Sequence, residues 1–504
     1  MFYKSGAKMI NKELTDITKK SGIVLIGRIL STIFGFFFSL LAARFMGPAV
    51  YGKIMYVLVV LTMLSVITRL GLTQGLVQFV SKLTDDKEVK KRNSLITFVF
   101  LIVTTFAIII SFLLYLNSNF IAVTLFNSQE LATVFKIMSP ILIIYSLIEL
   151  TPGIFRGLKI VKYQVIGRDL IQSLFRLIIV FIMGYLGYEL GGLITAYYIS
   201  MIVSLAYLVY KVYRLRLFEK IKREYLPDYK EILLFSFPLL ISGILHFSIG
   251  KIDIFMIGYF LEAQQVGVYT IALKIGTLTS FLLLSFNSIF APTITSLYYD
   301  NKIIKLKKLY QVITKWMLGI NLSFFFLFIL LSKEIMNVFG SGFVIGWLSL
   351  ILIMAGQVIN AGVGSAGLIN IMTGFPHSEL YVSLVVFTLN IVLNYVLIPI
   401  YGIEGAAFAS LISIGITNLL RLFILYRRLE FLPYNKNYLP VIISAVIAFV
   451  VSYIFNSFID VHYLIRIIMV GTIFTGIAIG LNFKLGIEEE DRMILERVKS
   501  KLFR

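Results

Sequence analysis

The stretch that decides the fold is residues 94–116, SLITFVFLIVTTFAIIISFLLYL, which contains no charged residue, no glycine and no proline. As an α-helix it would be about 35 Å long, slightly more than the ~30 Å hydrocarbon core of a bilayer. An uncharged apolar run of this length is typical of a helix that crosses a membrane.

Similar stretches recur along the whole chain of 504 residues, of which 59% are hydrophobic and 14% are charged. Soluble domains average about 45–50% apolar residues and roughly a quarter charged. No polar stretch is long enough for a secreted domain, a large cytoplasmic ATPase or a nucleic-acid-binding domain. We predict an all-α polytopic membrane protein with about fourteen transmembrane helices, at 21–46, 53–80, 94–116, 131–152, 163–187, 191–211, 232–261, 264–292, 313–332, 335–372, 379–400, 404–426, 438–457 and 463–483. The glycine-rich span 335–372 is expected to be broken.

The positive charges predict the orientation of these helices. Most of the 46 Lys and Arg residues lie in alternate connections, whereas the opposite connections hold only Arg44, Lys53, Lys136, Lys333 and Arg466. Such an asymmetry places the basic side in the cytoplasm, and an even number of crossings then places both termini there. The loop 373–378, which has neither Lys nor Arg, is the exception.

No metal site, catalytic residue or cofactor is expected. The chain has no cysteine, and its three histidines, His246, His377 and His462, are far apart in the sequence. The outer connections are short, whereas a membrane enzyme such as a sugar polymerase would need a substantial outer loop with catalytic residues. We therefore expect a protein that is not an enzyme.

Two pairs of segments match at nearly the same spacing. Residues 43–52 (ARFMGPAVYG) align with 258–267 (GYFLEAQQVG) at an offset of 215, and 191–196 (GGLITA) align with 404–409 (EGAAFA) at an offset of 213. A duplication would give two parallel six-helix bundles related by an axis along the membrane normal. The alternative is that both matches are ordinary glycine-rich outer turns. The predicted organisation is an N-terminal cytoplasmic segment 1–20, a first bundle 21–212, a cytoplasmic linker 213–230, a second bundle 231–428, helices 13 and 14 at 437–483, and a cytoplasmic tail 484–504.

Three groups of residues resemble the polysaccharide flippases, the polysaccharide-transport branch of the multidrug/oligosaccharidyl-lipid/polysaccharide exporter superfamily. They are the turn at 43–52, the segment from Phe237-Pro238 through Asp253 and Gly258 to Ala272, and the segment from Ile398-Pro399 through Gly402 to Ala407. The likeness runs from about residue 15 to 430. It implies a V-shaped pair of six-helix bundles that moves a lipid-linked sugar by alternating access, in the plasma membrane of a bacterium or archaeon.

Five basic residues are predicted to lie within the membrane: Arg28, Arg69, Arg176, Lys251 and Lys274. A charge in hydrocarbon costs at least a few kcal/mol, so such residues usually serve a function. We expect them to line a cavity and to hold the phosphate or pyrophosphate of a lipid-linked oligosaccharide. The alternatives are internal pairing and snorkelling to the interface.

The acidic residues near the membrane are Glu149, Asp169 and Asp253. Glu149 and Asp169 are near the cytoplasmic helix ends and are expected to lie at the interface or to pair with Arg156, Arg168 or Lys159. Asp253 lies about 200° around the helix from Lys251, which excludes a pair between these two. It could instead pair with Lys274, or bind a proton or sodium ion and couple transport to a gradient.

The function that these observations favour is translocation of a lipid-linked oligosaccharide from the cytoplasmic to the outer leaflet. The expected partners are membrane lipids and a sugar on a polyprenyl or dolichyl phosphate or pyrophosphate carrier, with no nucleic acid, and the protein is expected to work as a monomer. A cation-coupled multidrug or small-molecule antiporter of the same superfamily stays open as the alternative. Such an antiporter would favour acidic rather than basic residues in its cavity.

Overall fold

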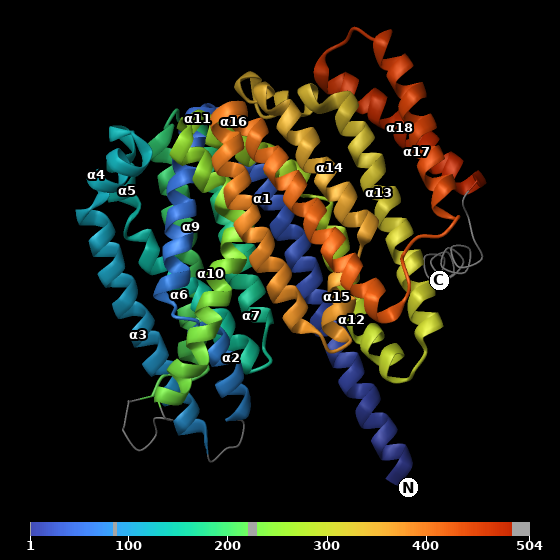
Figure 1. Ribbon diagram of the computed structural model, residues 1–504. Coiled ribbons are helices and arrows are strands. Elements are labelled where there is room, and N and C mark those ends of the chain that lie inside the picture. Colours follow the sequence, from blue (N-terminus) through green and yellow to red (C-terminus); the bar gives the residue numbers. More distant parts are fainter. Residues whose placement is uncertain (1, 84–87, 220–228, 486–504) are drawn as a thin grey trace. The chain divides into compact units, whose positions relative to one another are not determined.

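The computed structural model describes residues 2–83, 88–219 and 229–485 (Figure 1). Every regular element in these residues is a helix, which confirms the predicted all-α fold. Eight helices are long and apolar enough to cross a membrane, or up to eleven if each bent pair is one span. The count of fourteen stays a prediction. Parts of the predicted linker (220–228) and tail (486–504) lie outside the described residues.

The helices follow the predicted apolar stretches closely. They are α1 (Phe2–Thr68), α2 (Leu72–Lys82), α3 (Val89–Leu116), α4 (Ser118–Phe120), η2 (Ile121–Leu125), α5 (Gln129–Met138), α6 (Ile141–Gly157), α7 (Lys162–Gln164), η3 (Val165–Ile171), α8 (Gln172–Tyr185), α9 (Leu190–Arg214), α10 (Tyr229–Phe260), α11 (Ala263–Gly276), α12 (Ser280–Tyr299), α13 (Ile303–Asn337), η5 (Ser341–Gly346), α14 (Trp347–Val363), α15 (Ala366–Met372), α16 (Pro376–Leu429), α17 (Tyr438–Ser457) and α18 (Tyr463–Leu485).

Two of these helices are too long for one crossing and contain a kink. The apolar part of α1, Ile26–Thr68, would be about 65 Å long if straight, roughly twice the thickness of the hydrocarbon core. It kinks at Gly47, where φ is 70°, and α16 kinks at Gly402, where φ is 61°. Only glycine adopts such angles without a steric penalty. Each helix therefore holds two of the predicted spans.

Several further predicted spans are broken or bent within their length. The span 53–80 is interrupted between α1 and α2, where Leu70 and Gly71 both have positive φ. The span 264–292 bends by 47° between α11 and α12, and α10 bends by 58° between Lys230–Leu245 and Gly250–Phe260. The span 335–372 is broken at Gly340 and Gly364, as predicted. Irregular backbone at membrane depth is tolerated where it is buried in protein or lines a cavity.

The chain forms two compact units, Met1–Gly267 and Val268–Arg504. In the first unit α10 packs against α1 and α2. The predicted second bundle, 231–428, includes α10, so the boundary between the two units lies one span later than the predicted linker. The difference arises because α10 makes its long-range contacts with helices of the first unit.

A close contact within the first unit joins the two segments that the sequence alignment made equivalent. A Cβ on Gly52 would lie 1.7 Å from the carbonyl oxygen of Ala263, and a Cβ on Gly267 would lie 2.2 Å from that of Pro48. At the offset of 215 residues Gly52 corresponds to Gly267 and Pro48 to Ala263. Such reciprocity is what a two-fold axis between equivalent segments produces. It supports the duplication, although the rotation that relates the two bundles stays a prediction.

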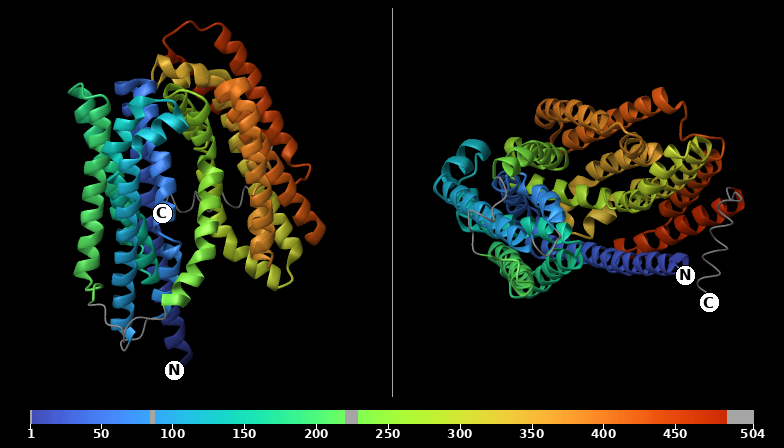
Figure 2. Two further views of the ribbon diagram at one scale, coloured as in Figure 1. Left: turned by 60° about the vertical axis from the view of Figure 1, so that its left-hand side comes forward. Right: turned by 90° about the horizontal axis from the view of Figure 1, so that it is seen from below.

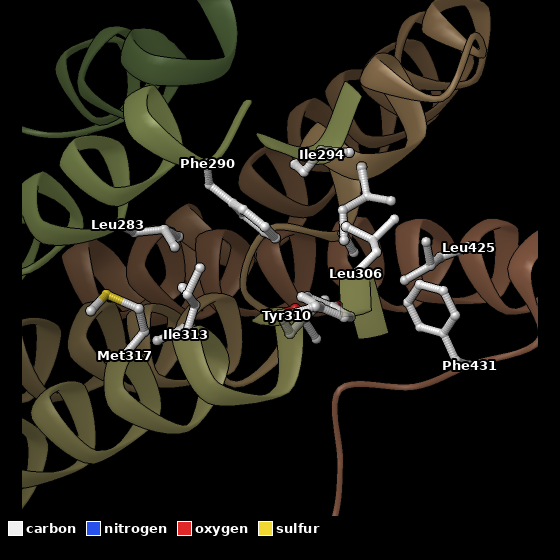
Figure 3. Packing of buried hydrophobic residues seen from close by; sticks show 13 residues of the cluster. Leu283, Phe290, Ile294, Leu306, Tyr310, Ile313, Met317, Leu425 and Phe431 are labelled. Carbon is white, nitrogen blue, oxygen red and sulfur yellow. The ribbon is translucent and has the colours of Figure 1, made fainter. Parts of the chain in front are cut away.

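The second unit is built around α13 and α14. A buried apolar cluster joins α12, α13, α15 and the end of α16 (Figure 3), with Phe290, Tyr310, Met317 and Leu425 among its members. The helices α17 and α18 form a pair that packs on α13 (Figure 2) through a smaller cluster around Phe474. Predicted helices 13 and 14 therefore belong to this unit.

Candidate functional site

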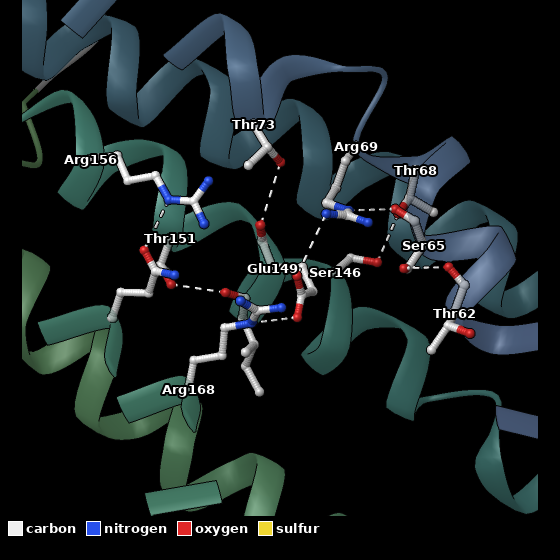
Figure 4. Close-up of polar contacts among 12 residues, drawn as sticks. Thr62, Ser65, Thr68, Arg69, Thr73, Ser146, Glu149, Thr151, Arg156 and Arg168 are labelled. Carbon is white, nitrogen blue, oxygen red and sulfur yellow. Dashed lines mark hydrogen bonds and ion pairs between the residues drawn. The ribbon is translucent and has the colours of Figure 1, made fainter. Parts of the chain in front are cut away.

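A carboxylate held between two guanidinium groups lies inside the first unit. Glu149 on α6 accepts a hydrogen bond from Nε of Arg168 at 2.7 Å, and its other oxygen lies 3.8 Å from Nη1 of Arg69 (Figure 4). The three side chains are largely buried, with 14%, 31% and 17% of their surfaces exposed. The expected pairing of Glu149 with Arg168 is confirmed, and Arg69 is a second partner that the sequence did not predict.

Arg69 lies at the break between α1 and α2. Its Nε donates to the carbonyl of Ser65 at 2.8 Å, which satisfies an acceptor at the end of α1. The following Gly71 has φ of 73°, and a Cβ there would lie 2.1 Å from the carbonyl oxygen of Ser236 on α10. The break therefore lets α10 approach the backbone closely, and Arg69 beside this break lies 3.8 Å from Glu149.

Arg168 lies on a short π-helix, η3. π-helical turns are rare and frequently mark functional sites, because the wider turn re-aims the side chains. Ser204 on α9 donates to the carbonyl of Gly167 at 2.9 Å, and α1 packs closely on η3, since a Cβ on Gly27 would meet Val165 at 2.4 Å. The packing of α1 and α9 thus fixes the segment that presents Arg168.

Further charges surround this pair of arginines. Arg168 also lies 3.9 Å from Asp169, and Arg156 donates to Oε1 of Gln164 at 3.2 Å. Both Arg28 and Arg156 lie within electrostatic range of Asp169, and the residues at these two positions are exposed. The resulting group has two acids, Glu149 and Asp169, and we call its basic members the arginine cluster: Arg28, Arg69, Arg156, Arg168 and Arg176.

Arg176 lies against aromatic rings. Its guanidinium carbon is 4.5 Å from the centroid of the Tyr197 ring and 5.4 Å from that of Phe38, a geometry that favours a planar cation. Its Nε is buried without an acceptor in the part of the chain that the structure describes. Tyr145, one turn before Glu149 on α6, lies within electrostatic range of Arg69, Arg168, Arg176 and Glu149, and so connects Arg176 with the cluster.

The two predicted lysines lie on other helices than these arginines. Lys251 follows the bend in α10 and is exposed, and Asp253 beyond it is buried. Lys274 lies in the second unit, two residues before the end of α11 and next to its break from α12. Arg69, Lys251 and Lys274 therefore share a feature that the sequence did not reveal, because each lies beside a break in a predicted span.

The structure brings together three of the five predicted cations, Arg28, Arg69 and Arg176. It adds Arg156 and Arg168, which the sequence predicted only as partners for the acidic residues. The adjacent Arg168 and Asp169 inside an otherwise apolar stretch were the available signal. Among the described residues, no group of three His, Asp or Glu side chains lies close enough to hold a metal ion.

Comparison with known proteins identifies the family of this chain. The family described as polysaccharide biosynthesis protein matches residues 17–298, more than half of the chain. The chain belongs to this family. The match confirms the resemblance to polysaccharide flippases, and it includes every residue of the arginine cluster.

Curated relatives of this family member come from archaea. An uncharacterised membrane protein of Methanocaldococcus jannaschii is 23% identical over 451 residues, 83% of this chain and 85% of that protein. Two Haloferax volcanii proteins match over shorter lengths. The one named "Probable flippase AglR" is 24% identical over 37% of this chain and 40% of its own length, and the one named "Probable low-salt glycan biosynthesis flippase Agl15" is 25% identical over 46% and 49%.

Solved structures show that this family member has the fold of transporters from the same superfamily. The lipid II flippase MurJ in an inward closed conformation superposes with a TM-score of 0.72 at 15% identity, covering 92% of this chain and 99% of that one. An inward-facing multidrug resistance transporter of the MATE family gives a TM-score of 0.63 at 14% identity, over 81% and 98%. At these identities the likeness concerns the fold alone.

Proposed function

We propose that this protein is a flippase that moves a lipid-linked oligosaccharide from the cytoplasmic to the outer leaflet by alternating access. The observation that carries the proposal is the arginine cluster, because this group of the first unit has five arginines and only two carboxylates, with Arg69 and Arg168 converging on Glu149. Two Haloferax relatives are named as flippases, which supports the same function for this protein. The lipid carrier is a polyprenyl or dolichyl phosphate or pyrophosphate, and the protein works as a monomer in the plasma membrane.

The chemistry of the cluster suits a phosphate head group. A guanidinium donates two parallel hydrogen bonds to phosphate oxygens, and it keeps its charge at every physiological pH. The head-group charge is the main electrostatic obstacle to moving a lipid-linked sugar through hydrocarbon. Arg69 and Arg168, which are largely buried and held in place by the packing of their helices, would replace the hydration of the phosphate without a large rearrangement.

A cation-coupled antiporter is the second candidate, because the fold is shared with a multidrug resistance transporter. A site for cationic drugs would be expected to have excess negative charge, whereas the cluster has excess positive charge. Coupling of transport to a proton or sodium gradient is a separate proposal for either function. Glu149 and Asp253 are the residues proposed to carry it.

Liposome transport distinguishes the two functions. Purified protein is reconstituted with a fluorescent lipid-pyrophosphate-linked sugar in one arm and with a cationic dye in the other. We expect the sugar lipid to exchange between leaflets several-fold faster than in protein-free vesicles, and the dye to show no protein-dependent movement. Dye movement driven by a sodium or proton gradient, without sugar-lipid exchange, would establish the antiporter instead. The same gradients applied to the sugar-lipid arm test coupling.

The proposed direction of transport depends on the orientation of the chain. The protein has no cysteine, so single cysteines can be introduced without background. Suitable positions are exposed side chains on each predicted side of the membrane. Asn119 and Gln264 are exposed at the predicted outer side, where the neighbouring Ser118 is buried and therefore unsuitable. Lys91 and Lys159 are exposed at the predicted inner side. We expect a membrane-impermeant maleimide to label cysteines at 119 and 264 in intact cells, and to label those at 91 and 159 only after lysis. Reversed labelling would reverse the orientation.

A further inference from the structure

Glu149 occupies the position that a bound anion would need. Its two carboxylate oxygens each face a different arginine, Arg168 at 2.7 Å and Arg69 at 3.8 Å (Figure 4). A phosphate that is to lie between the two guanidinium groups, as this carboxylate does, would take its place. Glu149 is one of the two carboxylates beside the arginine cluster. If its side chain moved away, the excess of positive charge would increase and the site would attract an anion more strongly.

We propose that Glu149 is a resident counter-anion of the arginine cluster, which the phosphate or pyrophosphate of the substrate displaces and which returns when the substrate leaves. The inference rests on the proposed function for the identity of the substrate. The exchange itself requires only an anion with phosphate chemistry. Glu149 is thus a residue that sets the affinity of the site.

The physical reason for a resident anion is the cost of an unpaired buried charge. Removing one partner from a buried ion pair is strongly unfavourable, because the remaining charge has neither water nor a partner. With Glu149 present, Arg69 and Arg168 are paired both before and after transport. The carboxylate also competes with the phosphate, which weakens substrate binding and favours release.

Contacts one turn before and one turn after Glu149 hold the backbone of α6 in place. A Cβ on Gly153 would lie 2.4 Å from the carbonyl oxygen of Thr73, so α6 packs directly on α2 one turn after Glu149. One turn before it, Ser146 and Thr68 share a hydrogen bond of 2.8 Å. The backbone of α6 is therefore held on both sides of Glu149, and the exchange that we propose is a rotation of the Glu149 side chain about its own bonds.

Anion binding to Glu149→Gln tests the proposal directly. Inorganic pyrophosphate is titrated into the purified full-length protein, and its binding is measured by calorimetry and by thermal stabilisation. We expect about tenfold tighter binding to Glu149→Gln than to the natural protein, with the gain lost in Glu149→Gln/Arg168→Gln. The matched control is Glu334→Gln, which removes a carboxylate of similar exposure, 16%, from its pair with Arg466 in the second unit. This control should bind pyrophosphate as the natural protein does.

Transport of the sugar lipid is the second arm. We expect Glu149→Gln to lower both KM and kcat several-fold, because the substrate binds more tightly and leaves more slowly, and Glu149→Asp to restore part of kcat. A carboxylate that only braces the fold would lower thermal stability and leave pyrophosphate affinity unchanged, which would overturn the proposal. If Glu149→Gln does not fold, the gain in affinity must appear in smaller measure in Glu149→Asp, whose shorter side chain weakens both contacts.

The two arms separate failure of this proposal from failure of the proposed function. Tighter pyrophosphate binding without any sugar-lipid exchange by the natural protein would keep the counter-anion and remove the flippase. Sugar-lipid exchange with no change of pyrophosphate affinity in the variants would keep the flippase and remove the counter-anion. Tighter binding of pyrophosphate but not of the sugar lipid would assign the site to a free phosphate compound.

Discussion

Replacing Arg69 and Arg168 together by glutamine is expected to reduce flipping of a lipid-pyrophosphate-linked sugar by about two to four orders of magnitude. Each charge-assisted contact to phosphate contributes about 1.5–3 kcal/mol, or roughly one to two orders of magnitude in affinity. The two guanidinium groups converge on one carboxylate, so both would contact one head group. Fluorescence loss on quenching of outer-leaflet lipid in proteoliposomes measures the rate.

The double variant leaves Glu149 as a buried carboxylate without these two partners, which could destabilise the protein. The triple variant Arg69→Gln/Arg168→Gln/Glu149→Gln removes that unpaired charge, and it should fold while still failing to transport. The matched control is Arg466→Gln/Glu334→Gln, which removes an ion pair of 3.1 Å from the second unit. Near-normal flipping by the triple variant would show that the arginine cluster does not hold the substrate.

Enlarging Gly52 is expected to have the largest effect on stability. A Cβ at this position would lie 1.7 Å from the carbonyl oxygen of Ala263 and 2.8 Å from the amide nitrogen of Gly267, and neither backbone atom can rotate away. We expect Gly52→Val to cost about 3 kcal/mol, at the upper end of overpacking penalties. The reciprocal variant Gly267→Val should cost a similar amount. The midpoint of heat-induced loss of the monomer peak in size-exclusion chromatography measures the change.

Gly35 provides the control, since it lies on the same helix and a Cβ there would meet nothing within 4 Å. In a helix interior, Gly→Ala normally stabilises by about 0.5–1 kcal/mol. Gly35→Ala should therefore raise the midpoint slightly while Gly52→Ala lowers it, so the two substitutions differ in sign. A Gly52→Ala variant as stable as Gly35→Ala would mean that the close contact is absent and that the reciprocal packing does not support the duplication.

The sequence by itself determined that this protein is a membrane protein, and it determined where most of its helices lie in the chain. Apolar runs such as 94–116 can satisfy their backbone groups in hydrocarbon only as helices, so composition and length were sufficient to predict them. Glycine positions also predicted the break in 335–372, because positive φ at Gly340 and Gly364 is accessible to few other residues.

Only the tertiary structure decided which charged residues meet. Apolar side chains cover most faces of a membrane helix, so its sequence does not state which face turns toward a neighbour. The pairing of Glu149 with Arg69 depends on the break at Leu70 and Gly71 and on the close packing of α6 on α2 at Gly153. The pairing with Arg168 depends on the π-helical turn of η3. These are properties of contacts between helices, and each couples residues that are distant in the chain, which is why the arginine cluster could be assembled only in three dimensions.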